Sequence, residues 1–238
     1  MANLKFQNGI KILRVKNPQE GFVICKKLLY ETVSKNTVLF LSGGSTPKTL
    51  YQILAKEKKL HAGAVAMVDE RFGGKLHENS NEKMIQDAGL IRYLEASKTR
   101  FYPILENKNF EQTTKDYDET VRYLFNYFPK SVGILGVGVD GHTAGIPARI
   151  QNSKFKTQNS ELVTNFNNFP GEHKERITLT FLGLSRLDEI IVLVFGKDKK
   201  KALQLMFEDG SIGEIPSRFL TQKEIMRKVT LIIDQAIK

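Results

Sequence analysis

The stretch "TVLFLSGGSTPKTLYQILAKEKK", residues 37–59, joins an apolar segment to an amphipathic one through a pair of glycines. Residues 37–44 form an unbroken apolar and β-branched run up to those glycines, which is typical of a strand buried on both faces. Residues 46–59 predict a helix, with Thr46 as its N-cap and Pro47 at its first position. A buried strand followed at once by a helix is the repeating unit of a parallel α/β sheet.

The same alternation of strands and helices recurs along the rest of the chain. It predicts an α/β fold with a Rossmann-like, mostly parallel sheet and helices on both faces. No repeat, low-complexity tract or linker interrupts the pattern, so we expect residues 1–238 to form a single domain. The predicted strands are 10–15, 63–70, 100–105, 131–138, 189–196 and 228–234, with further extended segments at 161–166 and 176–181, and the predicted helices are 18–35, 79–96, 109–128 and 198–209.

The composition is typical of a soluble globular protein with a basic surface. The 36 Lys and Arg residues outnumber the 26 Asp and Glu residues, and the net charge of +10 favours anionic partners. Because the lysines are dispersed and no RNP-like or zinc-knuckle motif accompanies them, we expect a phosphorylated metabolite rather than nucleic acid. No apolar run reaches the roughly 18 residues of a membrane span, and the N-terminus does not read as a signal peptide.

Cys25 is the only cysteine, so no intrachain disulfide forms, which suits a reducing cytoplasm. It lies in the predicted helix 18–35, and no histidine or cysteine accompanies it at a metal-ligand spacing. We therefore expect Cys25 to belong to the core. We expect a cytoplasmic protein, monomeric or a small homo-oligomer, that does not bind membranes.

Ligands of open α/β sheets bind at the carboxyl ends of the strands. This rule selects four loops of the predicted sheet as places for chemistry. They are residues 42–46, 69–80, 138–147 and 196–199.

The first of these loops reads "SGGST". Gly43 and Gly44 permit positive φ and close approach of the backbone, and the helix that follows presents free N–H groups. Ser45 and Thr46 add hydroxyl donors. These features suit an anion site, and they suit equally a tight turn with a capping threonine.

Charged side chains directly follow two other buried strands. Asp69 and Arg71 belong to "DER", which suits either a carboxylate and a guanidinium facing a polar ligand or a surface ion pair. Lys199 opposes the dipole of the helix that it opens, a cost that is lower if an anion lies between them. A solvated lysine run is the alternative for Lys199.

The loop 138–147, "GVDGHTAGIP", contains a GxGxxG pattern together with Asp140 and His142. A dinucleotide-binding turn must open a helix, but Pro147 follows Gly141 by only six residues and no apolar helix comes after it. Histidine titrates near neutral pH and is the commonest general base, so His142 is the candidate catalytic residue. No histidine or carboxylate cluster indicates a metal site, and no Gly-x-Ser-x-Gly elbow indicates a serine hydrolase.

Taken together, these motifs resemble the 6-phosphogluconolactonase family, in the superfamily shared with glucosamine-6-phosphate deaminase. The combination of SGGSTP, DER and GxGxDGHTA is specific, and the matching segments span about two-thirds of the chain. The segments are "LSGGSTPKTLY" (41–51), "VDER" (68–71), "NSNEKMI" (79–85), "GILGVGVDGHTAG" (133–145), "RITLTF" (176–181) and "GKDKKKAL" (196–203).

The resemblance implies a Rossmann-like parallel sheet and an ester hydrolase. The implied reaction is the hydrolysis of 6-phospho-D-glucono-1,5-lactone in the pentose phosphate pathway, with neither a metal nor an organic cofactor. It also implies that the substrate phosphate lies on the Gly43–Thr46 loop, helped by basic residues matching Arg71, Arg176 and Lys199.

The resemblance further implies that His142 activates water and that Asp69 and Asp140 orient the site. The family pattern usually continues as HTASLFP, whereas this chain has "HTAGIPA" at 142–148, which bears on the pocket wall and on selectivity. The deaminase branch carries a glutamate five residues after the loop histidine, where this chain has Pro147. That difference, the doubled glycine, "DER" and "HTA" favour the lactonase.

Two alternatives to a lactonase follow from the same resemblance. One is a glucosamine-6-phosphate deaminase or another sugar-phosphate isomerase. The other is a non-catalytic sugar-phosphate sensor, which is expected to need a DNA-binding segment. Because the predicted strand 10–15 stands near the start of the sequence, we expect no such segment before it.

Overall fold

A computed structural model describes residues 3–7, 9–150 and 160–236. Its main sheet has eight strands, and every neighbouring pair is parallel except β1 with β2. The prediction of a mostly parallel sheet is therefore confirmed. In spatial order the strands are β1 (Asn3–Gln7), β2 (Ile10–Arg14), β11 (Val229–Ile233), β10 (Glu189–Val194), β7 (Lys130–Gly136), β3 (Thr37–Leu41), β4 (Ala64–Met67) and β6 (Arg100–Tyr102).

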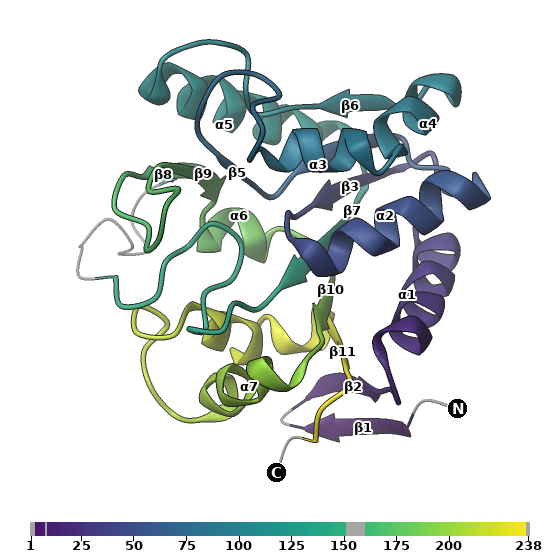
Figure 1. The fold of residues 1–238 in the computed structure, drawn as a ribbon, viewed down its shortest axis with the longest axis vertical. Helices are drawn as coiled ribbons and strands as arrows, with labels where there is room; N and C mark the ends of the chain where they lie inside the picture. The colour runs from purple at the N-terminus through teal and green to yellow at the C-terminus, as the bar shows by residue number, and fades with distance from the viewer. Residues whose placement is uncertain (1–2, 8, 151–159, 237–238) are drawn as a thin grey trace.

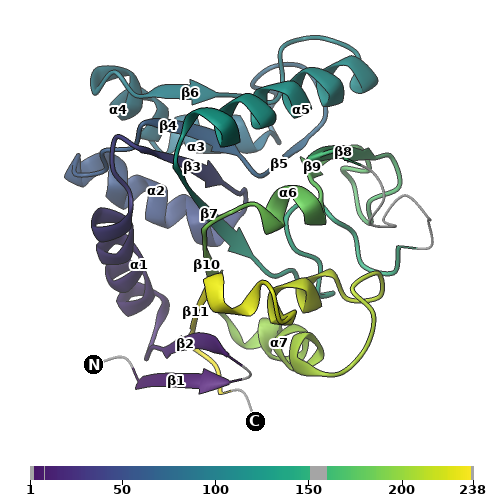
Figure 2. The same cartoon turned by 180° about the vertical axis from the view of Figure 1, so that it is seen from behind.

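Helices cover both faces of this sheet, as the alternation predicts. Helix α2 lies in front of the sheet in Figure 1, and α5 and α6 come to the front when the molecule is turned in Figure 2. None of the helices in the described ranges is long and apolar enough to cross a membrane. The helices are α1 (Pro18–Thr32), α2 (Ser45–Glu57), α3 (Asn81–Asp87), α4 (Leu90–Ala96), α5 (Phe110–Tyr127), α6 (Phe181–Ser185) and α7 (Lys200–Phe207).

The central strands are apolar on both faces because helices cover both. All five residues of β3 are buried, as are all four of β4. Cys25 is fully buried on α1, so its predicted place in the core is confirmed. Burial raises the pKa of the Cys25 thiol and keeps it protonated.

A second, antiparallel sheet corrects the predicted strand 63–70. Strand β4 ends at Met67, and after Val68 the chain forms β5 (Asp69–Arg71), which pairs with β9 (Arg176–Leu179). The sheet is completed by β8 (Val163–Phe166). The chain leaves the main sheet where its apolar residues end, so the charged "DER" segment pairs with β9 in the second sheet.

The predicted helix 79–96 is also wrong as a single element. It is divided into α3 and α4 at Gly89, whose φ of 80° lies in the left-handed region. A residue with that backbone conformation ends a right-handed helix, and glycine adopts it without a steric penalty.

The start of α2 differs from the prediction by two residues. Gly44, with φ of 115°, is the N-cap, so Thr46 is the second helical residue and Pro47 the third. No side chain caps this terminus. The positive φ of Gly44 turns the chain from strand into helix without a capping hydroxyl, and the first helical amides point away from the helix body.

Candidate active site

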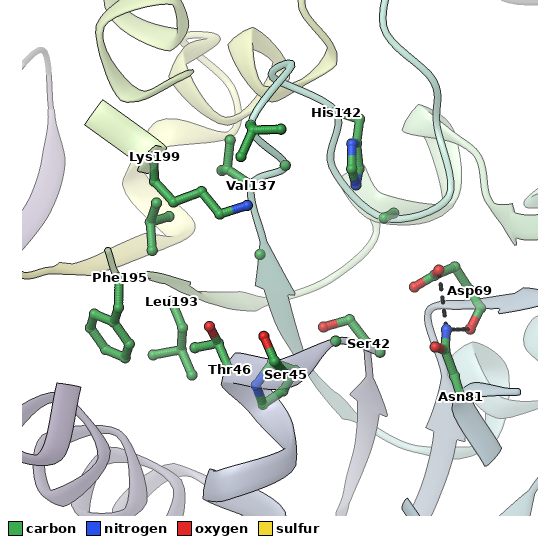
Figure 3. A pocket seen from close by; sticks show the side chains of 18 of the residues that line it. Ser42, Ser45, Thr46, Asp69, Asn81, Val137, His142, Leu193, Phe195 and Lys199 are labelled. Carbon is green, nitrogen blue, oxygen red and sulfur yellow. Dashed lines mark hydrogen bonds between the residues drawn. The ribbon is translucent and has the colours of Figure 1, made fainter. Parts of the chain in front are cut away.

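A pocket of about 290 Å³ opens at the carboxyl ends of β3, β7 and β10 (Figure 3). All four loops selected from the sequence contribute to its lining. The lining includes Arg176 on β9 and every residue predicted for the site on those loops except Asp140, which contacts the His142 ring. The predicted residues in the lining are Gly43, Gly44, Ser45, Thr46, Asp69, Arg71, His142, Arg176 and Lys199.

The loop after β7 folds tightly around His142. The main-chain N–H of Gly138 donates to the His142 carbonyl at 2.8 Å, and the Gly141 N–H donates to the Gly138 carbonyl at 3.0 Å. A Cβ added to Gly138 would lie 2.1 Å from the His142 ring, so only glycine leaves room for the imidazole. Gly141 has φ of 87°, which glycine adopts readily. These glycines form a turn that presents the His142 side chain, and the described residues 142–150 that follow form no helix of the kind that a dinucleotide site requires.

Asp140 fixes the protonation pattern of the His142 ring. Its Oδ1 lies 2.6 Å from His142 Nδ1 and accepts from the His142 main-chain N–H at 3.1 Å. Burial alone would raise the pKa of Asp140, but the hydrogen bonds and charge of His142 outweigh it and lower the pKa to about 2. An ionised carboxylate only accepts hydrogen bonds, so Nδ1 carries the proton and Nε2 of the neutral ring is free to take one.

Phe169 contacts both His142 and Arg176. Its ring meets the imidazole edge to face, with centroids 5.3 Å apart, and the Arg176 guanidinium carbon lies 4.5 Å from the same ring centroid. The main-chain N–H of Phe169 donates to the Lys174 carbonyl at 2.9 Å, which closes the turn that holds the ring. Phe169 thus joins the histidine to one of the cations.

The glycine loop after β3 provides main-chain donors. The first amides of α2 belong to Ser45 and Thr46, and Pro47 has none. The Ser45 and Thr46 side chains lie along the side of the pocket facing Lys199 (Figure 3). A helix N-terminus of this kind attracts anions through its free N–H groups and its dipole.

Three cations complete an electropositive lining. Arg71 and Arg176 are directly opposite each other in the β5–β9 register, and Lys199 is the residue before α7. Within the described parts of the chain none of the three has a carboxylate within 4.0 Å. Burial lowers the pKa of Arg176, and the charge of Arg71 adds to that effect while Asp69 opposes it. Like charges opposite each other destabilise a sheet, and an anion between them would relieve the repulsion.

Asp69 is the buried carboxylate of the pocket, with 7% of the residue exposed. Burial raises its pKa, although Arg176, Arg71 and His142 and a hydrogen bond from Asn81 act in the opposite direction. Figure 3 shows the Asp69 side chain next to Asn81, from which its carboxylate accepts that hydrogen bond.

The departure "HTAGIPA" from the family pattern has a steric reason. Gly145 donates its N–H to Thr178 Oγ1 at 3.0 Å, and a Cβ there would lie 2.9 Å from Thr178 Cβ and 3.2 Å from Asp69 Cβ. A serine at this position would push against β5 and β9. Ile146, which follows, is fully buried.

Sequence reasoning missed Phe169 and Asn81 as parts of the site. Asn81 lies in the quoted segment "NSNEKMI", but only its contact with Asp69 shows what it does. Phe169 lies between β8 and β9 in a stretch without a recognisable pattern. Among the described residues no group of three or more His, Cys, Asp and Glu side chains is arranged to hold a metal ion.

The fold and the pocket define an α/β protein with an electropositive site that carries a histidine–aspartate pair at the carboxyl edge of a parallel sheet. The chain belongs to the family described as glucosamine-6-phosphate isomerases/6-phosphogluconolactonase, whose model matches residues 25–230. The resemblance seen in the sequence motifs is therefore confirmed.

Both branches of the family are found among the similar proteins. A 6-phosphogluconolactonase from a Nostoc species is 32% identical over 191 residues, which cover 76% of this chain and 75% of that protein. A glucosamine-6-phosphate deaminase from Lactococcus lactis is 27% identical over 239 residues, which cover 95% of this chain and 97% of that protein.

Solved structures share the fold at lower identity. A 6-phosphogluconolactonase from Plasmodium vivax superimposes with a TM-score of 0.78 at 20% identity, covering 99% of this chain and 94% of that chain. A monomeric glucosamine-6-phosphate deaminase gives a TM-score of 0.74 at 20% identity, covering 94% and 97%. Both confirm the α/β fold, and at these identities they carry no conclusion about activity.

Proposed function

We propose that this protein hydrolyses 6-phospho-D-glucono-1,5-lactone to 6-phosphogluconate, a step of the pentose phosphate pathway. The observation that carries the proposal is the His142–Asp140 pair, whose imidazole lines a pocket together with Arg71, Arg176 and Lys199. The relatives named 6-phosphogluconolactonase support it.

In this mechanism His142 is the general base. Its Nε2 takes a proton from water while the water oxygen attacks the lactone carbonyl carbon, and a tetrahedral oxyanion forms. The ring C–O bond then breaks, and the leaving oxygen takes the proton back from Nε2. Asp140 keeps Nδ1 protonated throughout and stabilises the imidazolium. General-base catalysis of this kind contributes roughly 10²–10⁴-fold.

The electropositive side of the pocket holds the substrate phosphate. The N-terminus of α2 supplies main-chain N–H groups from Ser45 and Thr46, and the cationic side chains neutralise the charge. Binding energy from the phosphate, which lies away from the carbonyl, positions the lactone at His142.

A glucosamine-6-phosphate deaminase is the second candidate, because deaminase relatives match 95% of the chain. Pro147 stands where the deaminase branch carries its assisting glutamate, and proline has no group that moves a proton.

A paired assay tests the two candidates. In one arm glucose-6-phosphate dehydrogenase generates the lactone, and its decay is followed with a pH indicator. In the other arm ammonia release from glucosamine 6-phosphate is measured. We expect accelerated lactone decay and no ammonia; ammonia release with a lactone decay equal to the spontaneous rate would overturn the proposal.

A further inference from the structure

Asn81, at the first position of α3, is one of the residues that line the pocket, with 1% of the residue exposed. Its Nδ2 donates to the main-chain oxygen of Asp69 at 2.9 Å and to the Asp69 carboxylate at 3.3 Å (Figure 3). Two acceptors on one side fix which end of the amide is the nitrogen. The opposite oxygen, Oδ1, is buried and has no hydrogen-bond partner among the residues that the structure describes.

That oxygen packs against the glycine loop. A Cβ added to Gly43 would lie 1.8 Å from Asn81 Oδ1 and 2.1 Å from its amide carbon. Gly43 does not have positive φ, so its backbone conformation alone does not demand glycine. Glycine is required at position 43 because the side chain of Asn81 occupies the space.

The main chain of Asn81 is held as firmly as its side chain. Its N–H donates to Glu70 Oε1 at 2.6 Å, and the N–H of Glu82 donates to Glu70 Oε2 at 2.8 Å. Glu70 is fully buried on β5, beside Asp69. The middle residue of "DER" therefore anchors the start of α3, and Asn81 spans the space between β5 and the β3–α2 loop.

We propose that Asn81 is a positioning residue that sets Asp69 and the glycine loop at a fixed separation, so that the carboxylate and the anion-binding amides face one substrate. In this role it acts through Asp69 and Gly43, the two residues that its side chain contacts. The inference rests on the proposed function where it concerns turnover, and on geometry alone where it concerns the loop.

The first test replaces the amide by a side chain of similar size. Asn81→Leu removes the hydrogen bonds to Asp69, and we expect kcat of lactone hydrolysis to fall about tenfold, the scale of a lost hydrogen bond to a charged group. The part of the kcat/KM profile that reports Asp69 should move to higher pH, because this carboxylate loses a donor while Arg71, Arg176, His142 and the neighbouring Glu70 remain.

A background variant shows whether Asn81 acts through Asp69. In Asp69→Asn protein, Asn81→Leu should change kcat by no more than about twofold. The matched control is Asn165→Leu on β8, which also removes an amide hydrogen bond, to Thr114 Oγ1 at 3.0 Å, but lies outside the pocket. An unmoved pH profile in Asn81→Leu, or a loss that adds in full to that of Asp69→Asn, would overturn the proposal.

The second test needs no turnover. In the wild type we expect inorganic phosphate to raise the Tm. Gly43→Ala should lower the Tm and abolish that rise. Adding Asn81→Ala vacates the space beside position 43, and it should restore part of the Tm and part of the rise in Tm with phosphate. If the effects of the two substitutions on the Tm simply add, position 43 and the Asn81 side chain do not compete for the same space and the proposal is wrong. Coupling in this cycle with no lactonase activity in the wild type would refute the proposed function and leave the positioning role standing.

Discussion

The two sides of the pocket are built from different kinds of structure. On one side the chain leaves β3 and β7 through glycine turns at 42–47 and 136–147, which bring main-chain amides and His142 to the cavity. On the other side Asp69, Arg71 and Arg176 are fixed on the paired strands β5 and β9.

This difference separates two tasks. The glycine turns let the main chain pass close to the residues of the pocket. A larger residue does not fit there, since a Cβ at Gly138 would clash with the His142 ring. The antiparallel strands hold charges at fixed spacing: side chains two apart share a face, so Asp69 and Arg71 both line the cavity while Glu70 points away to α3. We propose that the turn at 136–147 supplies the chemistry and that the small sheet shares the binding of the phosphate with the N-terminus of α2 and Lys199.

The largest expected effect comes from a substitution on the turn side of the pocket. His142→Ala removes the base, and we expect kcat for the lactone to fall by about 10²–10⁴-fold. Affinity for 6-phosphogluconate, measured by calorimetry, should stay near the wild-type value because the cations remain. The exposed His61 offers a matched control, His61→Ala, with unchanged kcat. Wild-type turnover in His142→Ala would remove the assignment of the base.

The second largest expected effect comes from a substitution on the small sheet. Arg176→Ala removes a cation opposite Arg71, and we expect KM for the phosphorylated lactone to rise about 10–100-fold, the scale of a lost charged hydrogen bond. KM for unphosphorylated gluconolactone should change far less. Arg92→Ala, on α4 outside this pocket, is the control. An equal loss on both lactones would contradict a role in phosphate binding.

A smaller effect tests the link between the two sides. Phe169→Leu keeps an apolar side chain but removes the ring that contacts His142 and Arg176. Aromatic and cation–π contacts contribute about 0.5–1.5 kcal/mol each, so we expect kcat/KM to fall about three- to tenfold. Phe125→Leu, which disrupts a stacked pair with Phe40 elsewhere in the core, should lower stability without this kinetic change. Identical kinetics in the two variants would show that Phe169 serves packing alone.

The smallest effect concerns Glu70, whose pKa burial raises from 4.5 to about 7 against three main-chain hydrogen bonds. Between these values the folded state binds more protons at this group than the unfolded state, so stability falls as pH rises through the window. Glu70→Gln cannot titrate, and its free energy of unfolding from urea titrations should vary less between pH 4.5 and 7. The same slope in both proteins would show that Glu70 is ionised throughout.

The sequence predicted the turn side of the pocket well, because its determinants are local. Glycines after an apolar run mark the end of a buried strand, and His142 and Asp140 lie two residues apart in one loop. Even there, α2 begins two residues before the position that the sequence predicts. Thr46 has the character of an N-cap residue, but the chain turns at Gly44 without a capping side chain.

The small sheet was far less predictable. Strand β5 pairs with β9 across more than 100 residues of sequence, and "DER" continues an apolar run that belongs to another sheet. Phe169 and Asn81 reach the pocket and contact His142 and Asp69 only in the folded chain. No periodicity or spacing in the chain carries that information. The family resemblance alone pointed to Arg176.

The most direct test of lactone hydrolysis with recognition of the phosphate compares two lactones on the wild-type protein. The decay of 6-phosphogluconolactone and of unphosphorylated gluconolactone is followed by NMR, each against its spontaneous rate. Charge recognition by the small sheet and α2, joined to general-base chemistry at His142, predicts strong acceleration for the phosphorylated lactone and a kcat/KM at least about 100-fold above that for the other. Equal kcat/KM for both lactones, or no acceleration of either, would contradict it.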